Sequence, residues 1–480
     1  MVASIRLEHI IDSTLREGEQ APRVYFKPEE KCTLAKMIYE TVGEKLYMEI
    51  GSPYSPKYRA GVESVVKYFK ELGYGNARLI GHCRCLREDV DIAWKCGTWG
   101  VTIFLSPTEK HLLYKLNGMS YEKALATIRD VVSYAKDDLG FECVIYTMED
   151  ATSLPVEKII EVGKVAEEAG ADILKIPDTK GQAEPLQFRE IIAKTAEEIK
   201  IPLDVHCHND RGFAVINSIM GLLGGARSFD VSVMGIGERC GIADLVTSVE
   251  NLESLYGVKT GVDFKRIPQL YNYLSAISGI PIHPFHPIVG VFARTHKAGT
   301  HQKAVLRCPE TYETIDFSKY GLERLYEFGA MQSKELVEFL LSGYDIDQAV
   351  KSKIVDRIRS VSMEKGRDLR LPEVWSIIQE ETGKPVKTKP GFTGSIGDAI
   401  IFLKIKPGHG EQDVIENVRK LLAKYNVPFR IREITGYWDY LIDIKDIPNT
   451  ALLDTITQSI RSLNLGIEET STSIVFDEFR

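Results

Sequence analysis

Short apolar runs alternate with amphipathic segments over the first 255 or so residues of the chain. The short runs fit strands, and the longer segments place apolar residues three or four apart, as helices do. The predicted strands are residues 9–13, 46–51, 77–81, 101–105, 142–146, 172–176, 202–206 and 228–233, and the helices between them include 29–40, 121–136, 155–169 and 187–199. Eight strand–helix repeats in about 250 residues predict a closed (β/α)8, or TIM, barrel.

A doubly wound open sheet is the alternative, and it ranks second because no GxGxxG motif follows an early strand. We therefore assign residues 1–260 to a catalytic barrel domain. Residues 261–382 begin with scattered prolines and turn helical near 333–341, 345–364 and 371–381, which predicts a helical accessory region, or lid, over the barrel mouth. Residues 383–397, GKPVKTKPGFTGSIG, have the Pro, Gly and Lys content of an exposed linker.

The pattern changes again in residues 398–480. Strand patterns at 399–405, 429–435, 440–444 and 470–476 and helix patterns at 411–425 and 451–463 follow the order βαββαβ. That order predicts a small ferredoxin-like α+β domain. The domain is too small to host the chemistry of the barrel, so we interpret it as a regulatory sensor.

Composition narrows the functional classes. The chain has 44% hydrophobic and 27% charged residues and a net charge of -8, with no basic tail, so nucleic acid is not an expected partner. No apolar leader and no stretch long enough to span a membrane are visible. Eight cysteines are scattered without the spacing of a zinc or redox motif. We expect a cytoplasmic protein with reduced thiols.

Charged side chains cluster where the first predicted strand ends. The segment DSTLREGEQ (12–20) places Arg16, a fixed cation, beside Glu17, a hard oxygen ligand. This pair suits a site where a negative charge develops on an oxygen next to a metal ion. The alternative is a solvated loop that is merely rich in charge.

A second cluster, HCHND (206–210), ends the seventh predicted strand. Residues two apart on a strand share a face, so His206 and His208 both point into the barrel mouth. With Glu17 from the first strand, they form a set of three ligands that leaves positions open for a chelating substrate. A single barrel histidine is usually structural, but the pair with a nearby glutamate favours a metal site.

At these residues the chain resembles the metal-dependent Claisen condensing family of homocitrate, isopropylmalate, citramalate and Re-face citrate synthases. The resemblance covers about residues 5–340 and rests on DSTLREGEQ, MEIGSP (48–53), HCHND, GIGERCGIADL (235–245) and THKAGTH (295–301). Within the family, Glu17, Ile242 and the stretch TYETIDFSKYGLERLYEF (311–328) are similar to homocitrate synthases.

The resemblance implies a role for each site residue. Glu17, His206 and His208 would hold a divalent Mg, Mn or Zn ion, Arg16 would stabilise the developing oxyanion, and acetyl-CoA would be the co-substrate. The base that enolises acetyl-CoA would be His301, oriented by Tyr312 and Glu49. Substrate contacts are expected from Gln20, His82, Thr179, Lys175, Arg84, Thr147 and Glu149. The resemblance also implies a homodimer or larger homo-oligomer in which the base of one subunit acts at the barrel of another.

Departures from the family concern the acceptor. Ile145 stands where homocitrate synthases place an arginine for the distal carboxylate of 2-oxoglutarate. Thr102 occupies an acidic position associated with the recognition of a lysine amine, and Asp204 stands where the family has a glutamate before the first ligand histidine. A dicarboxylic 2-oxo acid needs a cation in the barrel. Lys175, helped by Arg84, is our candidate for this clamp. Alternatively, Lys175 pairs with a barrel carboxylate.

Homocitrate synthase, in lysine biosynthesis, is the first function considered. Re-face citrate synthase is the nearest rival, with 2-isopropylmalate or citramalate synthase as further options. A non-catalytic amino-acid sensor is the alternative from another class. The stretch ITGYWDYLIDIK (434–445) is similar to the amino-acid-sensing (RAM) domain of Lrp-type regulators, which implies an amino-acid effector, lysine being the first candidate.

Overall fold

The computed structural model describes residues 5–383, 397–406, 410–425, 427–447, 450–463 and 466–475. Two compact units divide the chain, residues 1–263 and 264–480, and each is described by itself. None of the helices among the described residues is both long and apolar enough to cross a membrane.

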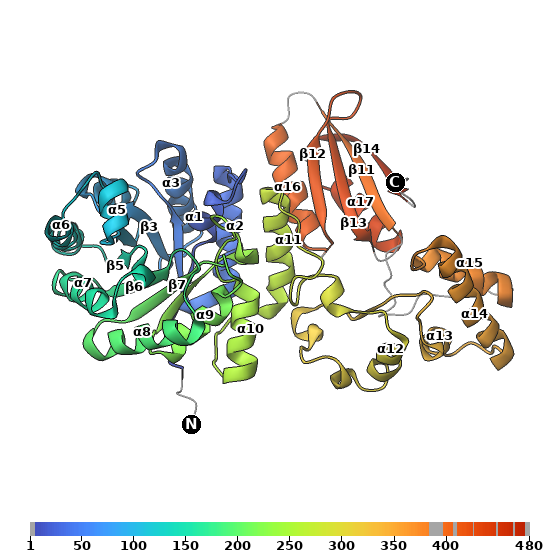
Figure 1. Ribbon diagram of the computed structural model, residues 1–480. Helices are drawn as coiled ribbons and strands as arrows, with labels where there is room; N and C mark the ends of the chain where they lie inside the picture. The colour runs from blue at the N-terminus through green and yellow to red at the C-terminus, as the bar shows by residue number, and fades with distance from the viewer. Residues whose placement is uncertain are drawn as a thin grey trace. The chain divides into compact units, whose positions relative to one another are not determined.

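The first unit is a closed barrel of eight parallel strands in sequence order, in which β8 pairs with β1 (Figure 1). The strands are β1 (His9–Asp12), β2 (Leu46–Gly51), β3 (Arg78–Arg84), β4 (Gly100–Leu105), β5 (Cys143–Met148), β6 (Ile173–Asp178), β7 (Leu203–Cys207) and β8 (Ser228–Val231). This arrangement confirms the predicted barrel.

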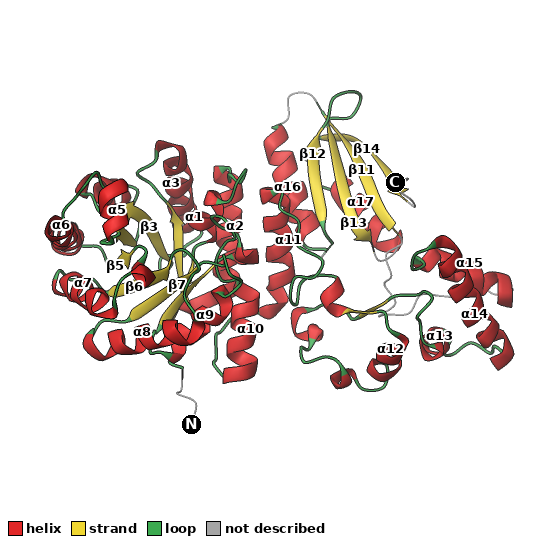
Figure 2. Ribbon diagram, viewed as in Figure 1, coloured by secondary structure: helices red, strands yellow, loops and turns green. Residues whose placement is uncertain are grey.

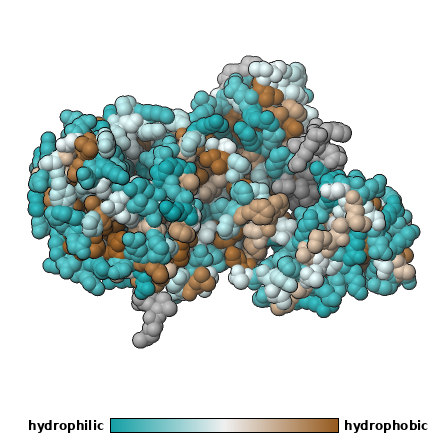
Figure 3. Space-filling model, in the orientation of Figure 1, coloured by the Kyte–Doolittle hydropathy of each residue, from teal (hydrophilic) through white to brown (hydrophobic). Residues whose placement is uncertain are grey.

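Helices surround the strands (Figure 2). They are α2 (Pro28–Val42), α3 (Pro56–Glu71), α4 (Arg87–Lys95), α6 (Tyr121–Ser133), α7 (Val156–Glu168), α8 (Pro185–Glu198), α9 (Ala214–Leu223) and α10 (Leu245–Tyr256), with the short α1 (Thr14–Glu17) and α5 (Glu109–Tyr114) in the loops after β1 and β4. Their amphipathic pattern explains the packing. In α6, Ile128 and Val132 are buried, whereas Lys123 is exposed. Hydrophilic residues accordingly dominate the visible face of this unit (Figure 3).

The barrel interior is layered. Ile11, Tyr47, Ile80, Cys143, Ile145 and Ile173 form one buried apolar cluster. Two residues further along their strands, Glu49 and Lys175 point into the same interior, because residues two apart share a face. The strands therefore change from an apolar layer to a charged layer toward their carboxyl ends, where barrel active sites lie.

The second unit begins with α11 (Ile267–Ser278) and continues with α12 (Gly299–Val305), α13 (Lys334–Leu340), α14 (Gln348–Lys365) and α15 (Leu371–Thr382). A two-stranded parallel ribbon of β9 (Thr295–His296) and β10 (Leu325–Tyr326) lies within this region. Leu336, Leu340, Ile354, Ile358 and Leu371 belong to its fully buried core. The predicted helices are thus present. Most of the predicted linker lies outside the described residues.

The C-terminal part is a four-stranded antiparallel sheet in the order β12-β13-β11-β14. Its elements are β11 (Gly397–Ile405), α16 (Glu411–Ala423), β12 (Phe429–Glu433), β13 (Tyr440–Ile447), α17 (Thr450–Arg461) and β14 (Ile467–Val475), which confirms the predicted βαββαβ order. Helix α11 packs against α16 and β12 of this domain. The fully buried Tyr273 hydroxyl donates to Glu416 Oε1 at 2.5 Å in that interface. The accessory region and the C-terminal domain therefore share a core contact.

Candidate active site

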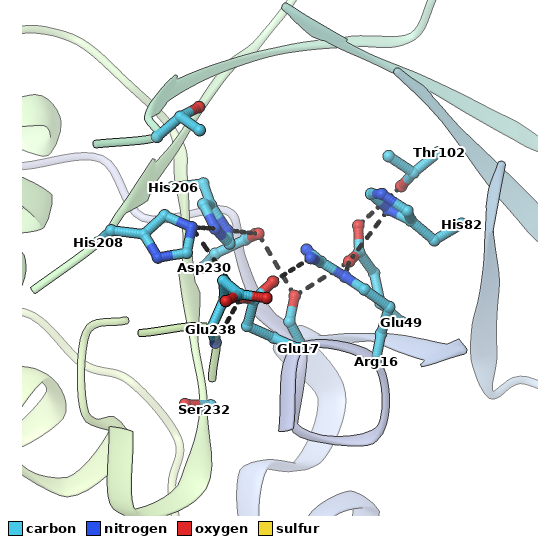
Figure 4. Close-up of polar contacts among 12 residues, drawn as sticks. Arg16, Glu17, Glu49, His82, Thr102, His206, His208, Asp230, Ser232 and Glu238 are labelled. Carbon is cyan, nitrogen blue, oxygen red and sulfur yellow. Dashed lines mark hydrogen bonds and ion pairs between the residues drawn. The ribbon is translucent and has the colours of Figure 1, made fainter. Parts of the chain in front are cut away.

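Three potential metal ligands meet at the mouth of the barrel. Glu17 ends α1, His206 lies in β7, and His208 follows that strand. One ligand atom from each lies within 4.8 Å of the other two, and all three side chains are buried. The two imidazole Nε2 atoms are 3.3 Å apart and face each other (Figure 4). Glu17, His206 and His208 therefore lie together, as the sequence pattern predicted.

Neighbouring groups fix the orientation of these ligands. Asp230 Oδ2 lies 2.6 Å from His206 Nδ1, so it accepts that proton and leaves the Nε2 lone pair of His206 available. The backbone N–H of Glu238 donates to Glu17 Oε1 at 3.1 Å. Gly237 allows this approach, because a Cβ there would lie 2.7 Å from Glu17 Cγ. The GIGERCG segment therefore supports the glutamate ligand.

The donor set fits a divalent cation. Burial, together with the neighbouring His206, lowers the pKa of His208 to about 3, so the imidazole is neutral. Its Nδ1 atom is buried and has no hydrogen-bond partner among the described residues. Two imidazoles and one carboxylate suit Mg, Mn or Zn, and a shared cation would use the Nε2 lone pairs, which otherwise face each other.

Arg16 lies between two carboxylates beside this cluster. Its Nε donates to Glu49 Oε2 at 2.8 Å, and its Nη1 contacts Glu17 Oε2. Burial opposes the charge, but Glu49 and Glu17 raise the pKa of Arg16 above its ordinary value. A permanent cation is therefore held next to the ligand set, where it can stabilise negative charge on a substrate oxygen.

Glu49 is the fully buried centre of the charged layer. Besides Arg16, its carboxylate accepts from Thr102 Oγ1 at 2.8 Å, Lys175 Nζ at 3.0 Å and Ser13 Oγ at 3.1 Å. Burial would favour the neutral acid, but Lys175 and Arg16 hold the pKa of Glu49 well below its usual range. It is consequently an anion that orients its neighbours.

Lys175 is fully buried among carboxylates. Its Nζ lies 2.7 Å from Asp230, 3.0 Å from Glu49 and 3.5 Å from Asp204. Asp230 and Glu49 accept hydrogen bonds from the ammonium group, and Asp204 adds a longer ion-pair contact. Although burial opposes it, these carboxylates raise the pKa of Lys175 above its ordinary value. The geometry therefore favours the alternative that Lys175 is a partner of barrel carboxylates over a free clamp for the substrate.

Two further predicted substrate contacts have other partners in the structure. The half-exposed Arg84 makes a two-pronged ion pair with Asp89, at 2.7 and 2.9 Å, and lies over the Tyr54 ring. Glu149 accepts from Lys115 at 2.6 Å. Because Asp89 already pairs with the Arg84 guanidinium, the structure does not favour Arg84 as a second cation for the substrate beside Lys175.

The remaining predicted contacts in the barrel differ in accessibility. His82 stacks on Phe104 with ring centroids 4.8 Å apart, and its Nδ1 lies 3.5 Å from Glu49. Thr147 is buried, and its hydroxyl has no partner among the described residues. The Thr179 hydroxyl accepts from the Asp150 N–H at 2.9 Å, and Gln20 is exposed. His82 Nδ1 and Thr147 Oγ1 are therefore buried polar atoms without a hydrogen-bond partner among the described residues.

The proposed base and its partner are adjacent in the second unit. The rings of His301, in α12, and Tyr312 are stacked with centroids 3.8 Å apart and an interplanar angle of 22°. Tyr312 is half exposed. The sequence motifs that carried these two residues thus converge on one pair.

Sequence reasoning missed Asp230. This residue lies in a predicted strand, is fully buried and contacts both His206 and Lys175. An aspartate inside an apolar strand, with inward-facing parity, is the signal that could have identified it.

Comparison with known proteins is consistent with this geometry. The HMGL-like family matches residues 8–274, and the family described as homocitrate synthase post-HMGL domain-like matches residues 288–364. A protein named homocitrate synthase AksA from Methanocaldococcus jannaschii is 39% identical over 377 residues, covering 78% of this chain and 90% of that protein. A protein named homocitrate synthase from Saccharolobus islandicus is 31% identical over 471 residues, covering 97% of this chain and 98% of that protein. This second alignment includes the C-terminal domain.

Solved structures support the fold. The HMG-CoA lyase of Bacillus subtilis matches with a TM-score of 0.50 and 21% identity, covering 57% of this chain and 94% of that one. The HMG-CoA lyase of Brucella melitensis matches with a TM-score of 0.50 and 20% identity, covering 57% and 99%. At this identity the likeness concerns the barrel fold alone.

Proposed function

This chain belongs to the HMGL-like family, in its homocitrate synthase branch, and we propose that it catalyses the Claisen condensation of acetyl-CoA with a 2-oxo acid. The acceptor that its relatives' name implies is 2-oxoglutarate, giving homocitrate and free CoA. The observation that carries the proposal is the buried set of Glu17, His206 and His208 with Arg16 held beside it.

The ligand set supports chelation of the acceptor. Glu17, His206 and His208 would hold a divalent ion, which when bound supplies Lewis-acid polarisation of the acceptor carbonyl. Asp230 keeps His206 in the tautomer needed for that role. Arg16 is placed to stabilise the alkoxide that develops on the ketone oxygen as the new carbon–carbon bond forms.

The proton transfer is assigned to the second unit. His301 would remove a proton from the acetyl methyl group, and the Tyr312 ring stacked on it would limit its rotation. Attack of the resulting enolate on the ketone carbon forms the product thioester. Water then cleaves that thioester and releases CoA.

One observation favours a second candidate acceptor. Ile145 lies in the apolar layer of the barrel, and the nearby Lys175 is already bound by carboxylates. A shorter dicarboxylate such as oxaloacetate would reach less far toward that layer. Re-face citrate synthesis is therefore the alternative to homocitrate synthesis.

Thiol release tests the proposed reaction. Metal-loaded protein should release CoA from acetyl-CoA only when a 2-oxo acid is added, and chelation should abolish release. A protein that releases no CoA with 2-oxoglutarate, oxaloacetate, pyruvate or 2-oxoisovalerate would contradict the proposal and favour a non-catalytic sensor.

We also propose that the C-terminal domain is a RAM-like sensor of an amino acid, with lysine as the first effector to test, and that the chain acts as a homodimer. The βαββαβ order and the alignment of the Saccharolobus islandicus relative over 97% of this chain support the regulatory assignment. Contact between α11 and α16 gives the domain a physical link to the rest of its unit.

A further inference from the structure

The residues next to His301 and Tyr312 are tied to the same short ribbon. His301 is followed by Gln302, and Tyr312 is followed by Glu313. Both of these neighbours contact His296, which lies in β9 and pairs with Tyr326 of β10. His296 therefore contacts both Gln302, next to the proposed base, and Glu313, next to Tyr312.

Gln302 is the anchor of α12. Its side chain is fully buried, and its Nε2 donates to the carbonyl of His296 at 3.0 Å and to the carbonyl of Glu327 at 2.8 Å. Its Oε1 accepts from the Ser333 N–H at 2.9 Å. Three hydrogen bonds from one buried amide fix α12 to β9, to the residue after β10 and to the N-cap of α13. The ring of His301 is one residue away.

Glu313 is the anchor of the Tyr312 segment. Its side chain is nearly buried, and its Oε1 lies 2.8 Å from His296 Nε2. Arg324 contacts both carboxylate oxygens, through Nε at 2.5 Å and Nη2 at 2.6 Å. Such a two-pronged pair fixes direction as well as distance. Although burial opposes the charge, Arg324 and His296 hold the pKa of Glu313 below its usual range.

We infer that Gln302, Glu313 and His296 form a clamp that sets the stacking of His301 on Tyr312, and that all three are positioning residues for the proton transfer. This inference rests on the proposed function, in which His301 is the base. The chain runs from α12 to Tyr312 through a short turn, and Tyr312 is half exposed, so buried contacts on its own ring do not fix the angle between the two rings. His296, the first histidine of THKAGTH, is thereby a positioning residue.

The test combines kinetics with a readout that needs no activity. In full-length protein with 13C-labelled histidine, the Tyr312 ring shifts the His301 signal upfield, and the loss of one signal in His301→Gln assigns it. We expect Glu313→Ala and Gln302→Leu to move that signal toward the value of an exposed histidine. With active wild type, kcat should fall about 10- to 100-fold while KM for the 2-oxo acid changes less than about threefold, since misplacing a catalytic group costs this order.

Glu335→Gln is the matched control. It removes the 3.0 Å pair between Glu335 and Lys303, which also ties α12 to α13 but does not touch the ribbon. Its kcat and His301 signal should match wild type. If Gln302→Leu does not fold, Glu313→Ala alone tests the clamp. Glu313 lies nearer the surface than Gln302, so its replacement should leave the protein folded.

Two results would overturn the clamp: an unmoved His301 signal in Glu313→Ala, or a moved signal with unchanged kcat in an active enzyme. Failure of the proposed function itself is distinguishable. A wild type that releases no CoA would refute the condensation, whereas a His301 signal moved by the anchor variants would still support the clamp.

Discussion

Asp230 joins the candidate metal site to the charged layer beneath it. The same oxygen, Oδ2, lies 2.6 Å from His206 and 2.7 Å from Lys175. The histidines could be predicted from their two-residue spacing at the end of one strand, because that inference needs only local geometry. Pairing of Lys175 with a barrel carboxylate was predicted only as an alternative, and its partners could not be identified, since Glu49, Asp204 and Asp230 come from three other strands and meet only in the closed barrel.

At the residue scale, the first prediction concerns the ligands. Removing either imidazole leaves two ligands, so His206→Ala or His208→Ala should weaken divalent metal binding by more than about 100-fold and abolish condensation in parallel. Isothermal titration of metal-free protein measures the affinity. Cys207→Ala, between the two ligands on the opposite face of the strand, should bind metal like wild type. Tight metal binding in both histidine variants would refute the ligand assignment.

A second residue prediction concerns acid stability. Burial, together with Arg78, lowers the pKa of His9 from 6.5 to about 4, and the ring stacks on Tyr47 at 4.1 Å. Between about pH 6.5 and 4 the unfolded chain binds a proton that the folded chain excludes, so stability falls as pH falls through that window. His9→Phe should lose this part of the decline, measured by urea unfolding at pH 7 and pH 5. Equal declines in both proteins would contradict it.

At the scale of elements, the barrel strands were predictable because apolar runs and helical periods repeat eight times. The loop conformations could not be predicted, since they depend on contacts with other parts of the fold and not on hydrophobic periodicity. The loop after β8 shows why. Gly241 has a φ of +76°, and a Cβ there would lie 1.8 Å from the Gly235 carbonyl oxygen. Glycine at this position lets the loop fold back and bring Gly237 against Glu17.

This close approach gives the element-scale prediction. Gly237→Ala should push Glu17 out of place and lower metal affinity at least tenfold while the barrel stays folded, because the added methyl would lie 2.7 Å from Glu17 Cγ. Gly75→Ala is the control, since a Cβ at Gly75 meets nothing within 4 Å. Circular dichroism reports whether each variant is folded, and metal titration measures its affinity for the metal. Equal affinities would show that Glu17 adapts freely.

At the scale of the whole molecule, the sequence predicted a separate C-terminal domain, but not that α11 would cover part of it. The buried Leu270, Tyr273 and Leu274 belong to a helix that packs on α16 and β12. Sequence patterns reveal that a helix has an apolar face, yet they do not identify the partner that buries it. The domain is consequently tied into its unit through more than the linker.

The contact predicts what truncation does. A chain ending at residue 383 should keep condensing activity and lose amino-acid inhibition, lysine being tested first. It should also bind a hydrophobic dye, because the α11 face loses its cover. Full-length Tyr273→Phe, which loses one hydrogen bond but keeps the domain, should retain inhibition. Inhibition that survives truncation would place effector binding elsewhere.

Competition between two acceptors tests whether this metal site condenses acetyl-CoA with 2-oxoglutarate in preference to oxaloacetate. Metal-loaded protein receives acetyl-CoA with equal concentrations of 2-oxoglutarate and oxaloacetate, and mass spectrometry counts the two products. We predict homocitrate in excess, with neither product formed after chelation. A predominance of citrate, or product formation that survives removal of the metal, would contradict the account.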